Sequence, residues 1–105
     1  MAWIYLILAG LFEIGWPVGL KMAQEENTRV TGVLLAVTFM GVSGFLLWLA
    51  QKQIPIGTSY AVWTGIGAAG TFLVGIIFYG DPVSLARYLG IVLIIAGVAT
   101  LRLAH

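Results

Sequence analysis

The chain has 105 residues, of which 61% are hydrophobic and 9% charged, and its formal net charge is +1. Because soluble domains carry about 25% charged residues, this composition excludes a soluble protein and predicts an all-α membrane protein with one domain over residues 1–105. The lysines and arginines stand singly, which excludes a basic nucleic-acid-binding patch, and the absence of cysteine removes disulfides and thiolate metal sites. We expect no metal or cofactor.

Four apolar stretches, separated by polar or turn-forming residues, predict four transmembrane helices. We expect them at approximately 2–22, 30–51, 57–79 and 83–103. The polar run 24–29 is the first loop, Pro55 and Gly57 mark a turn before the third helix, and Pro82 suits the start of the fourth. The connections are short, so neighbouring helices should run antiparallel.

Glu13 is a lone carboxylate inside the first apolar stretch. An ionisable group near the middle of a transmembrane helix costs at least about 2.5–3.5 kcal/mol on insertion scales, and such residues commonly mark ion, proton or substrate sites. Lys21, the nearest cation in the sequence, lies two helical turns away. We therefore interpret Glu13 as a functional residue, with a structural ion pair as the alternative.

Three residues flank Glu13 on its own helix. Gly10 and Trp16 lie at i−3 and i+3, so the carboxylate is expected between a gap in the side-chain surface and a large indole. Pro17 lies at i+4 and has no N–H, which leaves the Glu13 carbonyl without its intrahelical donor and predicts a kink. In lipid that carbonyl needs another donor, such as a hydroxyl, a water or a ligand.

The third helix carries Tyr60, Trp63 and Gly67 at i, i+3 and i+7, which is one helical face. Aromatic residues at this spacing usually pack or form an interfacial belt. A hydroxyl beside an indole also offers a hydrogen-bond donor and a π-face to a cation. Gly65 and Gly67 thin this helix and predict a place for it to bend.

On the fourth helix, Gly90 and Gly97 are seven residues apart and share a face. Small residues at such spacing let helices approach closely, so this pair predicts a packing seam in a dimer. Glycine is common in membrane helices, and one pair alone is also compatible with ordinary packing.

The charges are distributed almost evenly between the two ends of the predicted helices. Antiparallel neighbours place Lys21, Arg29 and Arg87 on one side of the membrane and Lys52 and Arg102 on the other. Orientation depends on a clear Lys/Arg bias, which is weak here. We therefore expect insertion in both orientations and an antiparallel homodimer; a single fixed topology is the alternative.

Along its whole length the chain resembles the small multidrug resistance transporters. The resemblance rests on the four helices, the acid in the first helix, the motif PIGTSYAVWTGIG from Pro55 to Gly67, and the paired glycines of the fourth helix. It implies an antiparallel homodimer in which the two copies of Glu13 form one site that exchanges protons for a small cation.

Within that family the chain is most similar to the guanidinium-exporter subtype, through Trp16, Lys21, the run 63–68 and a basic residue at Arg102. There are two departures: Pro17 replaces a non-proline residue, and Arg102 stands where lysine is common. Arginine does not release its proton, so any role of Arg102 must be ion pairing.

The resemblance implies a multi-pass protein of the cell inner membrane that exports guanidinium and small substituted guanidinium cations and is not an enzyme. Glu13 would bind substrate and protons in turn. The residues implied around it are Trp16, Ser43 and Trp63 as hydrogen-bond donors that orient the carboxylate, Tyr60 as a gate or further donor, and Gly10 as room for the ligand.

Two other functions remain open at the level of sequence. An exporter of quaternary ammonium or aromatic cations would use the same Glu13 with a looser aromatic pocket. A small membrane subunit or pore-forming protein would instead pair Glu13 with a cation from a partner.

Overall fold

The computed structural model describes residues 1–104 as a row of helices. The elements are α1 (Ala2–Glu13), α2 (Gly15–Met22), the short 3₁₀ helix η1 (Glu26–Thr28), α3 (Arg29–Ala50), α4 (Ile56–Tyr79) and α5 (Leu85–Ala104). The spans Ala2–Met22, Glu26–Ala50, Ile56–Tyr79 and Leu85–Ala104 are each long and apolar enough to cross a membrane. The chain is therefore a multi-pass membrane protein, as its composition predicts.

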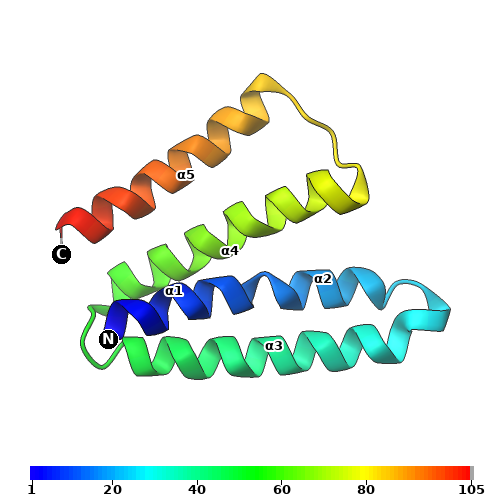
Figure 1. Ribbon diagram of the computed structural model, residues 1–105, viewed down its shortest axis with the longest axis horizontal. Coiled ribbons are helices and arrows are strands. Elements are labelled where there is room, and N and C mark those ends of the chain that lie inside the picture. The colour runs from blue at the N-terminus through cyan, green and yellow to red at the C-terminus, as the bar shows by residue number, and fades with distance from the viewer. Residues whose placement is uncertain (105) are drawn as a thin grey trace.

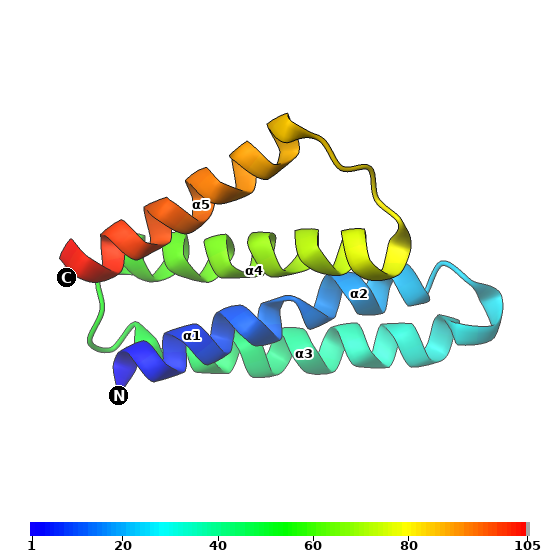
Figure 2. The same ribbon diagram turned by 45° about the horizontal axis from the view of Figure 1, so that its top comes forward.

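The helices lie side by side in the order α3, α1–α2, α4, α5, and each runs antiparallel to the span that follows it in the chain (Figure 1). The Cα atoms extend over 45 × 34 × 16 Å. The first span packs on α3 along its whole length, and α1 also packs on α4. A turned view shows that α5 approaches α4 near the C-terminus and diverges toward the 80–84 loop (Figure 2). None of the residues of α5 is buried.

The first span is interrupted at Ile14, between α1 and α2. The Ile14 N–H donates to Leu11 O at 3.3 Å, the tighter spacing of a 3₁₀ turn. Pro17 explains the position of the interruption, because it has no N–H for the Glu13 carbonyl and its ring crowds that oxygen. The kink expected from Pro17 thus appears as a break directly after Glu13.

Glycines allow the close contacts of the first span with its neighbours. A Cβ atom on Gly19 would lie 2.7 Å from Ala36 N and 2.7 Å from Gly32 O, so α2 and α3 touch through their backbones. The buried core lies at the end of the bundle that holds the 51–55 turn. It comprises Ala2, Leu6, Ala50, Ile54 and Val62.

The helix ends follow ordinary capping chemistry. Gly80 ends α4 in the left-handed conformation with φ of +65°, which glycine adopts without strain. The fourth span begins two residues later than expected, because Ser84 caps it and Pro82 does not: Ser84 Oγ accepts a hydrogen bond from Arg87 N at 3.2 Å. The first loop is held to the end of α2 by Thr28 Oγ1, which donates to Met22 O at 2.6 Å.

Candidate functional site

Glu13 is the last residue of α1, and its side chain lies against the backbone of α4. A Cβ atom on Gly67 would lie 2.5 Å from Glu13 Cγ and 3.2 Å from Glu13 Cβ. Only glycine at this position leaves room for the carboxylate-bearing side chain. α4 runs without interruption through Gly65 and Gly67, and the bend expected at these two glycines stays a prediction.

A cavity of about 260 Å³ opens beside the Glu13 carboxylate, between the first span and α4. The first span supplies Glu13, Trp16 and Pro17, and α4 supplies Thr64, Gly67, Ala68 and Thr71. We refer to it as the Glu13 cavity. Glu13 Oε1 and Trp16 Nε1 are buried here and form no hydrogen bond of strict geometry, but the Trp16 indole N–H interacts with the Glu13 carboxylate. A buried polar atom is costly in a low-dielectric site. Glu13 Oε1 is an acceptor and suits a ligand that donates hydrogen bonds, whereas Trp16 Nε1 is a donor, for which the Glu13 carboxylate is the acceptor at hand.

Ser43 and Trp63 form a hydrogen-bond network close to Glu13. The fully buried Ser43 Oγ donates to Ala9 O at 2.7 Å and accepts from Trp63 Nε1 at 2.8 Å. One hydroxyl therefore links α3, α1 and α4 one helical turn before Glu13. In this structure both donors are used within the network, so the direct contact with the Glu13 carboxylate that the resemblance implies stays a prediction.

Tyr60 and Gly10 occupy different surroundings. Tyr60 is 57% exposed, and its ring lies 5.5 Å from the Trp63 ring, centroid to centroid; its role as a gate or further donor stays a prediction. A Cβ atom on Gly10 would lie 2.7 Å from Ile66 Cβ, so this glycine lets α1 and α4 meet. Gly10 does not line the Glu13 cavity, and its role toward a ligand stays a prediction.

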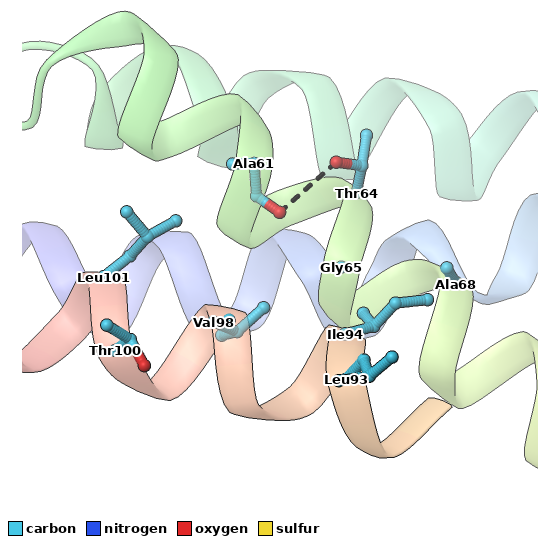
Figure 3. A pocket seen from close by; sticks show the side chains of 10 residues that line it. Ala61, Thr64, Gly65, Ala68, Leu93, Ile94, Val98, Thr100 and Leu101 are labelled. Atoms are coloured by element: carbon cyan, nitrogen blue, oxygen red, sulfur yellow. Dashed lines mark hydrogen bonds between the residues drawn. The ribbon is translucent and has the colours of Figure 1, made fainter. Parts of the chain in front are cut away.

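A larger, mostly apolar cavity of about 660 Å³ lies between α4 and α5 (Figure 3). Thr64 and Ala68 line both this cavity and the Glu13 cavity, so the two adjoin along one face of α4. Gly97 is part of its wall, whereas Gly90 has open space around it. The role of these two glycines in a dimer stays a prediction.

Sequence reasoning missed Thr64, Ala68 and Thr71 as cavity-lining residues. Their spacing of i, i+4 and i+7 on the third helix was available as a signal, because it defines one helical face. Thr64 Oγ1 donates to Tyr60 O at 2.7 Å, a bond within its own helix. Within residues 1–104 there is no group of three His, Cys, Asp or Glu side chains that could hold a metal ion.

Comparison with known proteins assigns this arrangement to a family. The sequence model of the Small Multidrug Resistance protein family matches residues 1–94. The chain belongs to this family. It is 49% identical to the guanidinium exporter of Yersinia pseudotuberculosis serotype I (strain IP32953) over 104 residues, covering 99% of each chain. It is 45% identical to the guanidinium exporters of Salmonella typhimurium (strain LT2) and Proteus vulgaris, covering 99% of this chain and 98% and 99% of theirs.

In this member of the small multidrug resistance family, Arg102 has a contact that its sequence position did not predict. The Arg102 guanidinium lies over the Trp3 ring, 4.9 Å from its centroid. This cation–π contact joins the C-terminal end of α5 to the first turn of α1. Arg102 therefore acts on helix packing, far from the Glu13 cavity, and needs no acid partner to be accommodated.

Proposed function

We propose that this chain is a proton-coupled antiporter that exports guanidinium and small substituted guanidinium cations, with Glu13 binding substrate and proton in turn. The observation that carries the proposal is the Glu13 carboxylate in the wall of a cavity of about 260 Å³, with Trp16 beside it. The guanidinium exporters that match over the full chain support the choice of substrate.

The chemistry of the cavity fits a planar cation that donates hydrogen bonds. A guanidinium presents paired N–H groups that match the two oxygens of one carboxylate, and charge-assisted bidentate contacts are stronger than neutral hydrogen bonds. Trp16 also lines this cavity, and an indole face attracts cations. A quaternary ammonium ion has no N–H to donate and would form no hydrogen bond with the Glu13 carboxylate.

Coupling follows from competition for the same oxygens. A proton on Glu13 removes the negative charge that holds the cation, and a bound cation occupies the atoms that a proton needs. The proton gradient drives export only if the empty, deprotonated protein rarely changes the side to which it opens. A carboxylate is sufficient for this exchange, and we assign no enzymatic step to the chain.

The working unit is proposed to be an antiparallel homodimer in the cell inner membrane, with a lipid bilayer around it. A second copy in the opposite orientation would add a second Glu13 to the site. The near balance of charges between the two ends of the bundle supports both orientations.

The decisive experiment is guanidinium flux into proteoliposomes under an imposed pH gradient. In the parent protein, the proton-driven uptake rate should saturate as the guanidinium concentration rises. Glu13→Gln should keep the fold and lose both uptake and guanidinium binding. Glu26→Gln removes a carboxylate from the exposed first loop and should behave as the parent.

Any of four results would contradict the proposal. Coupled transport that persists in Glu13→Gln would separate transport from this carboxylate. Transport of quaternary ammonium or aromatic cations without guanidinium would assign the chain to the other subtype. Current without proton coupling, or a partner protein purified in constant stoichiometry, would indicate a pore or a membrane subunit.

A further inference from the structure

A second charged cavity adjoins the Glu13 cavity, at the ends of α2 and α4. It has a volume of about 190 Å³, and its wall includes Lys21, Tyr79 and Asp81. We refer to it as the Asp81 cavity. Pro17 and Thr71 line both the Asp81 cavity and the Glu13 cavity. The two cavities therefore follow one another along α4, in the direction of the 80–84 loop.

Asp81 is more exposed than Glu13, but its side chain also lies against a glycine of α4. The left-handed Gly80 turns the chain back over the helix end, and Asp81 N–H donates to Gly75 O at 3.1 Å. A Cβ atom on Gly75 would lie 3.0 Å from Asp81 Cγ, so the carboxylate occupies the space that the glycine leaves free. Gly67 and Gly75 thus each accommodate one acidic side chain, about 12 Å apart along the helix at 1.5 Å per residue.

A third cavity continues toward the first loop. It has a volume of about 320 Å³, and Lys21 and Tyr79 line both it and the Asp81 cavity. The Lys21 ammonium lies 5.8 Å from the centroid of the Tyr79 ring. Glu25 is in the wall of this outer cavity. Each of the three successive cavities therefore has one carboxylate in its wall, and the only cation among their wall residues is Lys21.

We propose that these three cavities form the route by which the guanidinium cation moves between the aqueous first-loop side and Glu13, with Asp81 as the intermediate binding carboxylate. This inference rests on the proposed function, because it takes guanidinium as the substrate. Carboxylates in a cleft with low-dielectric walls concentrate cations and raise their association rate. Lys21, on the opposite wall, keeps the cation from remaining at Asp81 and favours its transfer onward.

The first test compares two neutralised carboxylates on the same side of the bundle. Asp81→Asn keeps the backbone turn and removes the charge, whereas Glu26→Gln removes a charge from η1 that lines none of the three cavities. Guanidinium flux in proteoliposomes gives kcat/KM, and equilibrium binding of guanidinium to the detergent-solubilised protein gives Kd. We expect Asp81→Asn to lower kcat/KM about three- to tenfold with Kd within about twofold of the parent, and Glu26→Gln to change neither.

Two further measurements separate a route from a structural role of Asp81. The kcat/KM of the parent should fall as ionic strength rises, and this dependence should be weaker in Asp81→Asn, because salt screens exposed charges. Thr71→Leu places a larger apolar side chain between the first two cavities and should slow flux more than it weakens binding.

The outcomes distinguish the route from the function. No guanidinium flux by the parent would contradict the proposed function itself. Flux by the parent, with Asp81→Asn and Glu26→Gln giving equal kcat/KM and equal salt dependence, would overturn the route alone. The route would also be overturned if Asp81→Asn raised Kd by the same factor by which it lowered kcat/KM. The variant would then have damaged the Glu13 site.

Discussion

Gly67 on α4 is the surface on which the Glu13 side chain rests: a Cβ atom at Gly67 would lie 2.5 Å from Glu13 Cγ. Real Cβ atoms do not approach other carbons so closely, so any larger residue at this position moves either the carboxylate or the helix. The position of the candidate site therefore depends on a residue that contributes no functional group.

Gly67→Ala tests this relationship. Displacing the carboxylate should lower guanidinium affinity about tenfold or more, because small errors in the placement of a binding group are costly. Overpacking should also destabilise the fold by about 1–3 kcal/mol. Binding isotherms and thermal unfolding in detergent give both quantities. Gly41→Ala is the matched control, since a Cβ atom there would contact nothing within 4 Å; equal effects in the two variants would show that Gly67 is not a steric requirement.

Pro17→Ala should join α1 and α2 into one helix, because an alanine N–H can donate to the Glu13 carbonyl. The straighter helix should narrow the Glu13 cavity, in whose wall Pro17 lies. We expect substituted guanidines with a short alkyl or polar group to inhibit guanidinium flux in the parent and to inhibit it less in Pro17→Ala. Identical inhibition profiles across such a panel would mean that Pro17 has no influence on substrate range.

The hydrogen bond between Trp63 and Ser43 should couple the two residues energetically. Ser43→Ala leaves Trp63 Nε1 without its acceptor, which should cost about 1–3 kcal/mol of unfolding free energy. The double variant Ser43→Ala/Trp63→Phe should lose less stability than the two single losses added together. Thr100→Val is a control, because the Thr100 hydroxyl bonds only within its own helix, to Ala96 O at 2.7 Å. Strict additivity would argue against the network.

Both orientations should be present in the membrane. A tag at the C-terminus of the full-length chain should react with an impermeant reagent in intact cells for one part of the population, and only after permeabilisation for the rest. The even distribution of lysine and arginine gives the reason. Labelling of the whole population from one side would exclude the antiparallel homodimer.

The contact between Arg102 and Trp3 should hold the end of α5 on α1. Arg102→Lys keeps a cation over the indole and should leave the free energy of unfolding close to that of the parent. Arg102→Gln removes the cation and should lower the free energy of unfolding by about 0.5–1 kcal/mol. Lys52→Gln provides the control: Lys52 Nζ lies 4.4 Å from the centroid of the Trp48 ring, a contact local to the end of α3. Equal stability of the parent, Arg102→Gln and Lys52→Gln would show that the contact does not secure α5.

The sequence alone predicted the four spans and the location of the acid, because apolar length and an isolated charge are local properties. The break beside Glu13 was also predictable, since Pro17 acts on a carbonyl four residues before it. The partner of Ser43 was not, because it depends on which helices are neighbours: its hydroxyl bonds Ala9 O, 34 residues away in the chain. The contacts of Glu13 with Gly67 and of Asp81 with Gly75 were not predictable for the same reason. A glycine in a helical sequence does not indicate which side chain packs against it.

α5 has no buried residue and makes fewer contacts within the chain than the other spans do. Val98 and Leu101 pack against the core and Arg102 lies over Trp3, whereas no residue of α5 lines the Glu13 cavity. If copies associate through α5, substitutions in this helix can change whether the partner is an identical chain or a related one. Such substitutions would leave the choice of transported cation unchanged.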